Sequence, residues 1–199
     1  VLDGGKESDQ LFGSSGEDLL KGGEGNDFLD GGSQNDQLQG NNGDDDLYGM
    51  RGNDQLLGGR GDDQLEGGLG DDLLQGGAGD DIYNYAINDG QDIVDETSGY
   101  DVLELSGFEI NQIWLTQQQN DLLIQFTGEQ GQLTIKDWNT PGDFAIDEIR
   151  VGDLALINNQ IESLVNAMAA FDPESGGGIE QFTMPEALEP VLAANWQSA

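Results

Sequence analysis

Aspartate recurs at a fixed interval in the first half of the chain. One Asp stands at every ninth residue from Asp9 to Asp81, and an apolar residue follows each of them two places later. Carboxylates stacked one layer apart repel strongly unless a cation lies between them. Their hard oxygens, together with loop carbonyls, suit Ca²⁺, which accepts roughly six to eight oxygen ligands in flexible geometry. The chain has no His and no Cys, so a transition metal is a poor candidate.

The aspartates belong to a nine-residue unit that repeats without a gap from Gly4 to Asn84. Each block opens with Gly at position one, carries Asp at position six and has an apolar residue at position eight. The blocks are GGKESDQLF, GSSGEDLLK, GGEGNDFLD, GGSQNDQLQ, GNNGDDDLY, GMRGNDQLL, GGRGDDQLE, GGLGDDLLQ and GGAGDDIYN. A fixed short period predicts one structural unit stacked on copies of itself, because a single unit cannot bury its apolar residue alone.

The block also predicts its own local structure. Glycine at positions one, two and four predicts a tight loop, since glycine takes φ > 0 and lets backbones approach closely. The three residues after each Asp predict a minimal strand whose middle side chain faces inward. Stacked at about 4.8 Å per layer, the inward residues would form a thin apolar column. They are Leu2, Leu11, Leu20, Leu29, Leu38, Leu47, Leu56, Leu65, Leu74 and Tyr83.

The blocks resemble the nonapeptide G-G-x-G-x-D-x-U-x of RTX (haemolysin-type calcium-binding) proteins. The resemblance implies a parallel β-roll with two nonapeptides per turn, so that repeats n and n+2 stack. It also implies that each Ca²⁺ lies between stacked loops, held by position-six Asp side chains and by backbone carbonyls. The odd-numbered stack of aspartates has five gaps and the even-numbered stack has four, so up to about nine ions are expected.

The ligands that the resemblance implies are the position-six aspartates and the glycines of the regular loops. The aspartates are Asp9, Asp18, Asp27, Asp36, Asp45, Asp54, Asp63, Asp72, Asp81, Asp92 and Asp101. The glycines are Gly22, Gly23, Gly25, Gly31, Gly32, Gly40, Gly43, Gly49, Gly52, Gly58, Gly59, Gly61, Gly67, Gly68, Gly70, Gly76, Gly77 and Gly79. No catalytic residue and no organic cofactor is expected.

The period continues past the regular blocks. After a two-residue insertion, Tyr85 and Ala86, the blocks INDGQDIVD and ETSGYDVLE keep the Gly of position four, the Asp of position six and an apolar position eight. Two regular blocks depart at position four, where Glu7 and Gln34 replace Gly, and sites that use those loops should bind calcium less well. Residues 1–3 are similar to the tail of a preceding block, so we expect the chain to be the C-terminal piece of a longer protein.

The composition restricts the partners and the compartment. The formal charge is −34 with six Lys plus Arg, so without counter-ions a compact state would repel itself and the repeats should be disordered. Nucleic acid and anionic membranes are poor partners for such a chain. The lack of Cys suits an exported protein without disulfides. No N-terminal signal peptide and no long apolar run is found, so we expect an extracellular, monomeric chain without membrane insertion.

From about residue 105 the glycines thin out, and β-branched and aromatic residues appear. Alternating patterns predict strands over residues 113–117, 121–126, 132–138, 145–151 and 154–157, with short connectors at 118–120 and 128–131 that favour antiparallel hairpins. This part is similar to the segment that follows RTX repeats and covers the open end of the roll. We therefore expect a roll over residues 1–104 and an antiparallel β cap over 105–157.

The last segment, residues 158–199, predicts two helices. The first places Ile161, Leu164, Val165, Met168 and Phe171 on one face, with Asn158 or Asn159 as the N-cap. A polar, Gly-rich break covers residues 172–178. The second helix would be capped by Thr183, begin near Pro185, carry Leu188, Val191, Leu192 and Trp196, and be open to a kink at Pro190. The ending EALEPVLAANWQSA is similar to the uncleaved type I secretion signals of RTX proteins.

Other interpretations of these features were weighed. A flexible acidic spacer would not keep a nine-residue register with an apolar position, and no block has the Glu that ends an EF-hand loop. The three tryptophans, Trp114, Trp138 and Trp196, suit a carbohydrate platform less well than core packing. Acidic pairs such as Asp147 and Glu148 lack a nucleophile constellation for acid–base catalysis. The acidic character of the terminal helices argues against membrane binding.

The sequence thus predicts a noncatalytic, extracellular calcium-binding module of the RTX type. It would be unfolded at cytosolic calcium, pass through the type I secretion machinery and fold outside the cell. Two alternatives stay open for a longer protein: a giant surface adhesin, in which this module packs at the cell surface or binds a ligand, or an exported hydrolase, lipase, protease, epimerase or toxin with its active domain upstream.

Overall fold

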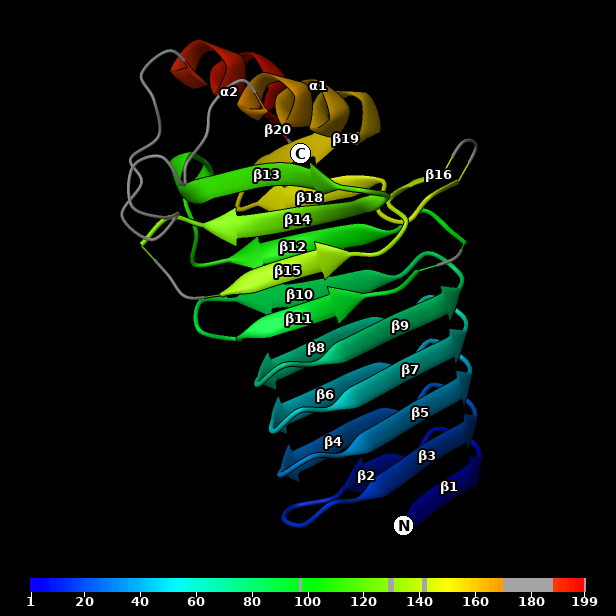
Figure 1. Ribbon diagram of the computed structural model, residues 1–199. Helices are drawn as coiled ribbons and strands as arrows, with labels where there is room; N and C mark the ends of the chain where they lie inside the picture. Colours follow the sequence, from blue (N-terminus) through cyan, green and yellow to red (C-terminus); the bar gives the residue numbers. More distant parts are fainter. Residues whose placement is uncertain (97, 129–130, 141–142, 170–187, 199) are drawn as a thin grey trace.

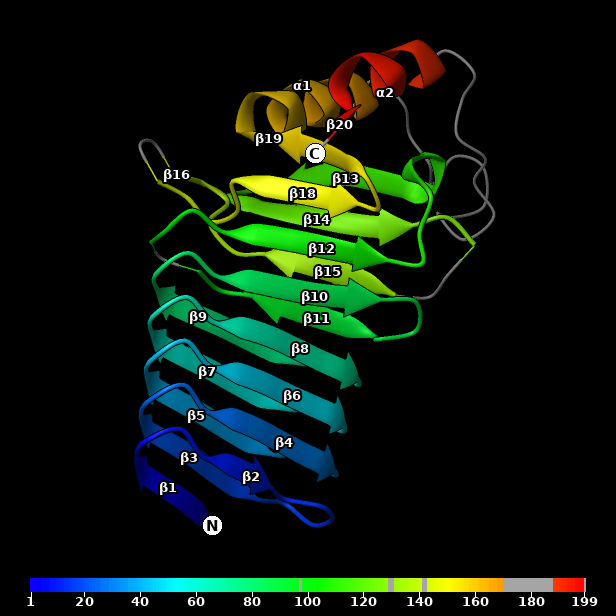
Figure 2. The ribbon, with the colours of Figure 1, turned by 180° about the vertical axis from the view of Figure 1, so that it is seen from behind.

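Consecutive strands alternate between two nine-stranded sheets, because each block supplies one strand and one reversal of the chain. The computed structural model describes residues 1–96, 98–128, 131–140, 143–169 and 188–198. The first sheet has the order β1-β3-β5-β7-β9-β11-β15-β14-β13, and the second has the order β2-β4-β6-β8-β10-β12-β18-β19-β20. Figure 1 shows the first sheet in front, and Figure 2 shows the second from behind.

Strands of the repeats pair in parallel with the strand one full coil away. Leu20 pairs with Leu38, and Leu29 pairs with Leu47, at a spacing of 18 residues in both cases. The predicted parallel β-roll, with repeat n stacked on repeat n+2, is therefore confirmed. The two-residue insertion lengthens the last coil to 20 residues, so that Tyr83 pairs with Leu103. The disguised blocks after Asn84 thus form the last strands of the roll, as predicted.

Most repeat strands are longer than the three residues predicted. They run from position seven of one block to position three of the next, and the paired residues skip the glycine of position one, as in the β3–β5 pair. The strands of the roll are β1 (Leu2–Lys6), β2 (Gln10–Phe12), β3 (Leu19–Glu24), β4 (Phe28–Ser33), β5 (Gln37–Asn42), β6 (Asp46–Arg51), β7 (Gln55–Arg60), β8 (Gln64–Leu69), β9 (Leu73–Ala78), β10 (Ile82–Ala86), β11 (Gln91–Val94) and β12 (Val102–Ser106).

The position-eight side chains form the predicted inner column. From Leu20 to Leu103 they are buried, with at most 2% of each residue exposed. Leu11 is partly buried, and Leu2 is 36% exposed. The expectation of a buried Leu2 is wrong, because Leu2 lies in the first strand of its sheet, where only β3 packs beside it.

The cap continues both sheets of the roll. In the first sheet β15 (Gln132–Ile135) joins β11 in parallel, and β14 (Asp121–Phe126) and β13 (Ile113–Gln118) follow it in antiparallel fashion. In the second sheet β18 (Glu148–Val151) joins β12 in parallel, and β19 (Leu154–Ile157) and β20 (Gln197–Ser198) follow. A short 3₁₀ helix, η1 (Ile110–Gln112), and a small hairpin of β16 (Asn139–Thr140) and β17 (Asp143–Phe144) complete the cap.

The predicted antiparallel hairpins are confirmed, although two strands are shorter than expected. The strand over 132–138 ends at Ile135, and the strand over 145–151 begins at Glu148. Trp114, Trp138 and Trp196 are buried, with at most 6% exposed, so they pack in the core and do not form a carbohydrate platform.

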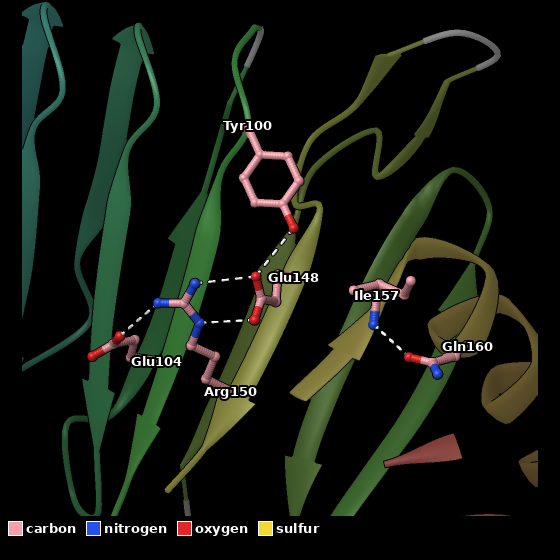
Figure 3. Close-up of polar contacts among 6 residues, drawn as sticks. All are labelled: Tyr100, Glu104, Glu148, Arg150, Ile157 and Gln160. Carbon is pink, nitrogen blue, oxygen red and sulfur yellow. Dashed lines mark hydrogen bonds and ion pairs between the residues drawn. The ribbon is translucent and has the colours of Figure 1, made fainter. Parts of the chain in front are cut away.

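Side chains from the roll and the cap meet at their junction. Tyr85, the first residue of the insertion, stacks on Phe126 with ring centroids 5.3 Å apart, and Phe108 stacks on Phe126 at 4.0 Å. In the second sheet Arg150 donates to Glu148 at 2.8 and 3.1 Å and to Glu104 of β12 at 3.3 Å (Figure 3). Hydrogen bonding from Arg150 lowers the pKa of Glu148. The insertion and these pairs therefore fix the cap onto the last coil.

Two helices lie over the far end of the cap (Figure 1). In α1 (Asn158–Met168), Ile161, Leu164, Val165 and Met168 are buried, as predicted. The predicted Asn cap is wrong: the N-cap is Ile157, whose backbone N–H donates to the Gln160 side chain at 2.9 Å (Figure 3). Among the described residues no helix is long and apolar enough to cross a bilayer.

The second helix is shorter than predicted. It is α2 (Glu189–Asn195), and Pro190 lies in its first turn, where the missing N–H costs no hydrogen bond, so it does not kink the helix. Leu188, Leu192 and Trp196 are buried. The predicted Phe171, Thr183 and Pro185 positions and the break over 172–178 lie outside the described residues.

Candidate calcium sites

The position-six aspartates form two continuous ladders, one along each edge of the roll. The backbone N–H of each Asp donates to Oδ1 of the Asp one coil further on, at 2.7 to 2.9 Å, from Asp9 and Asp18 up to Asp101 and Asp92. This hydrogen bond fixes the rotamer of every receiving carboxylate. The structure therefore brings together the aspartates that the sequence predicts as ligands, in the predicted odd and even stacks.

The second oxygen of these carboxylates has no hydrogen-bond donor among the described residues. Oδ2 is buried and unpaired in Asp27, Asp36, Asp45, Asp54, Asp63, Asp72, Asp81 and Asp101. At most 3% of each of these residues is exposed. Buried polar atoms are nearly always paired in native proteins, and a buried charge is costly without a partner. A repeated row of such oxygens therefore fits a row of bound cations.

Each unpaired oxygen converges with a backbone carbonyl on one small space. A Cβ placed on Gly40 would lie 2.3 Å from Oδ2 of Asp45 and 2.7 Å from the carbonyl oxygen of Gly58. The same geometry recurs one coil on, where a Cβ on Gly58 would lie 2.3 Å from Oδ2 of Asp63 and 2.8 Å from the carbonyl oxygen of Gly76. Hard oxygens from a carboxylate and a carbonyl are the donors that Ca²⁺ prefers.

The glycine of position one thus has a different role from the one predicted. Positive φ is found at positions two and four, for example at Gly59 and Gly61, but at none of the position-one glycines. Position one requires glycine because a Cβ would fill the space on which the Asp oxygen and the carbonyl converge. The expectation that all three glycines take φ > 0 is therefore wrong for position one.

The glycines of positions two and four lie against the neighbouring coil. A Cβ on Gly61 would lie 2.2 Å from the carbonyl oxygen of Gly43, and one on Gly59 would lie 2.4 Å from that of Asn41. Five other residues occupy these positions with positive φ: Glu7, Ser14, Gln34, Asn41 and Met50. A residue with a Cβ is strained in this backbone region.

Burial in the stack opposes the charged form of the aspartates. Desolvation raises the pKa of Asp63, Asp92 and Asp101 to about 8 and that of Asp72 to about 7. An unfolded Asp has a pKa of about 3.9, so the ion-free roll loses stability as the pH rises from about 4 through these values. At neutral pH the stack therefore needs a bound cation to remain both charged and buried.

A second ladder at position five was missed by the sequence analysis. The backbone N–H of Asp62 donates to Oδ1 of Asp44 at 3.0 Å, and that of Asp80 donates to Oδ1 of Asp62 at 2.9 Å. On the other edge the N–H of Asn53 donates to Oδ1 of Asn35 at 2.9 Å. These bonds run backward along the roll, whereas those of position six run forward. The frequency of Asn and Asp at position five is the signal that could have revealed them.

A parallel β-roll with stacked, unpaired carboxylate oxygens defines a calcium-binding repeat protein. The family model of the RTX calcium-binding nonapeptide repeat matches in four copies, over residues 3–38, 21–56, 39–74 and 57–87. Residues 3–87 of this chain therefore belong to the RTX calcium-binding repeats, and the cofactor of these repeats is calcium.

One solved structure is also similar to the chain. It is the solution structure of the AlgE6R3 subunit from the Azotobacter vinelandii mannuronan C5-epimerase, at 20% sequence identity. The match covers 66% of this chain and 80% of that one, with a TM-score of 0.24. A similarity at this level does not transfer an activity.

Replacing Gln34 with Gly is expected to lower the calcium concentration at which the chain folds. Gln34 has φ 76°, and glycine would relieve about 1 kcal/mol of backbone strain. A calcium titration followed by far-UV circular dichroism gives the midpoint. Gln37→Gly is the matched control, since Gln37 lies in β5 outside the positive-φ positions and glycine should raise the midpoint there. An unchanged or higher midpoint for Gln34→Gly would show that glutamine is tolerated at position four.

Proposed function

We propose that this chain is a calcium-triggered folding module of an exported protein. The observation that carries the proposal is the row of buried Oδ2 atoms without a donor, which repeats from Asp27 to Asp101. The aspartates of the odd and even ladders, with the glycine carbonyls of the stacked loops, would hold up to about nine calcium ions in the gaps. In this proposal the module itself has no catalytic role.

Calcium concentration would set the state of the chain. With a formal charge of −34, the ion-free repeats favour an expanded chain, which is the form that a secretion channel can pass. Sites of extracellular modules have dissociation constants of roughly 10⁻⁴–10⁻³ M, so they are empty in the cytosol and filled outside. Each site at ten times its dissociation constant contributes about 1.4 kcal/mol, and stacked sites act together. Folding would also oppose the return of the chain into the channel.

Three segments would share this task. Residues 1–104 would form the calcium-binding roll, residues 105–157 the cap that covers it, and residues 158–199 an export region read by type I secretion machinery. The continuous sheets across the roll and the cap support a cap that acts as a template for the last coil. The export role rests on the similarity of the chain ending to type I signals, and much of that segment lies outside the described residues. The folded product would be a secreted or surface-exposed monomer.

The proposal is tested by titrating the chelated chain with calcium. We expect a cooperative gain of β signal by circular dichroism and a fall in hydrodynamic radius by size-exclusion chromatography. The dialysed product should hold several calcium ions per chain by elemental analysis, up to about nine. Magnesium is the control, because it prefers a rigid octahedral shell and retains its waters. A chain that folds equally in EDTA, or equally with magnesium, would contradict the proposal.

A further inference from the structure

Two departures from the nonapeptide meet in the last coil of the roll. Tyr83 stands at position eight, where the other regular blocks have Leu, and Glu96 stands at position one, where they have Gly. The two residues are 13 apart in the sequence and are joined by a hydrogen bond in which the Tyr83 hydroxyl donates to Oε2 of Glu96. A carboxylate has therefore entered the loop position that supplies only a backbone carbonyl elsewhere.

The Glu96 carboxylate is fixed on several sides. It accepts from the backbone N–H of Gly77 at 3.0 Å and from that of Ser98 at 3.1 Å. The Tyr83 hydroxyl is held in turn by the backbone N–H of Gly76 at 2.6 Å. Glu96 is 6% exposed and Tyr83 is fully buried. These contacts hold a charged side chain in place inside the roll.

The carboxylate faces the last gap of the odd-numbered stack. One oxygen each of Asp81, Glu96 and Asp101 lies within 4.8 Å of the other two, and all three residues are buried. Oδ2 of Asp81 and Oδ2 of Asp101 have no hydrogen-bond donor among the described residues, and neither Asp is exposed. Two unpaired oxygens and a third carboxylate thus surround one space.

No other group of three acidic residues within the described ranges has this geometry. In the last gap of the even-numbered stack, Asp89 is also buried near the ladder, but its Oδ2 accepts from the backbone N–H of Ala86 at 2.5 Å. Asp89 therefore closes the turn that contains the insertion. The gap between Asp81 and Asp101 stands apart from the other gaps in its charge.

We propose that Glu96, positioned by Tyr83, is an additional ligand in the gap between Asp81 and Asp101 and makes it the calcium site that fills first. The inference rests on the proposed function, because it assigns an order to the same set of sites. Three carboxylates offer a divalent cation more charge than two, and ligand charge and rigidity set calcium affinity. The preformed hydrogen bonds of Glu96 reduce the ordering cost of binding.

The position of this site gives the early binding step a structural role. The backbone N–H of Asp101 donates to Oδ2 of Asp147 in the cap at 3.2 Å, and the N–H of Asp147 donates to the carbonyl of Asp101 at 2.9 Å. The N–H of Asp81 donates to Oδ1 of Asp101 at 2.9 Å. A cation in this gap would therefore join the last regular block to a loop already held by the cap, and the earlier coils would add to that template.

The test compares Glu96→Gln with the full unmodified chain. Glutamine keeps the shape of the side chain and removes its charge. Competition with a chromophoric calcium chelator gives the first macroscopic binding constant, and we expect it to weaken about tenfold. Glu162→Gln is the matched control, because Glu162 is exposed on α1 and its loss changes the net charge equally. In Tyr83→Phe, which keeps all three carboxylates, we expect a smaller weakening of the first constant.

The outcomes separate the possible roles. A first constant that weakens in Glu96→Gln but not in Glu162→Gln supports the ligand role. An unchanged first constant in Glu96→Gln, in a chain that still folds with calcium, overturns it and leaves Glu96 as an internal partner of Tyr83. If Glu96→Gln does not fold even in excess calcium, Tyr83→Phe decides: a wild-type first constant there overturns the inference. An unmodified chain that neither binds calcium nor folds with it defeats the proposed function itself.

Discussion

Gly70→Ala is expected to prevent the normal stacking of the roll. Gly70 occupies position four with φ +151°, and a Cβ there would lie 1.7 Å from the carbonyl oxygen of Gly52. The obstructing atom is backbone in the neighbouring coil, so no side chain can move aside. We expect a loss of about 3 kcal/mol or more, seen as a large rise in the calcium midpoint by circular dichroism or as failure to fold.

Gly16→Ala is the matched control for this prediction. Gly16 also occupies position four with φ +113°, but nothing lies within 4 Å of its Cβ position, because Gly16 belongs to the first blocks of the roll. Only the local backbone strain remains, about 1 kcal/mol, so the midpoint should rise modestly. Equal effects in the two variants would show that stacking contact between loops does not decide the requirement for glycine.

Truncation after Glu104 is expected to abolish monomeric calcium-dependent folding or to raise its midpoint strongly. It removes β13 to β20 and leaves β11 and β12 as open sheet edges. Tyr85, which stacks on Phe126, and Leu103 would lose their cover. Exposed edges and apolar ends of a stacked fold lead to association with other chains. Calcium titration by circular dichroism, with size-exclusion chromatography at each step, measures both effects.

Removal of residues 1–18 is the control for the truncation. It takes β1, β2 and two aspartates from the opposite end, where Leu2 is already 36% exposed. Both sheets and the cap remain, so the midpoint should stay within about twofold, since few stacked interfaces are lost. If the chain that ends at Glu104 folds as a monomer at the midpoint of the full chain, the cap is dispensable and its template role is wrong.

The repeat half of the fold could be predicted almost completely, because each requirement recurs at the same position. The column from Leu20 to Leu103 and the ladders of Asp follow from a nine-residue period alone. In the cap, alternation predicts the hairpins, but no local pattern says that β15 would join β11 or that β18 would join β12. Those partners lie about 40 residues apart, and parallel pairing carries no turn signal.

The details of the sites could be predicted less well. The sequence shows that position one is glycine, but not that the reason is the space beside Oδ2 of Asp45 and its equivalents, which is defined only when two coils are stacked. Glu96 stands out in the sequence only as a missing glycine. Its meeting with Tyr83 and Asp101 depends on the insertion of Tyr85 and Ala86, which sets the last coil at 20 residues.

The alternation of strands between two sheets also governs how the roll can vary in length. Because stacked partners are 18 residues apart, two added blocks would lengthen the molecule by one coil, about 4.8 Å, and keep every upstream strand in its sheet. A single added block would transfer all upstream strands to the opposite sheet while preserving their contacts with one another. The parity of the repeat number would therefore decide from which face of the roll its N-terminal end departs, independently of the cap at the other end.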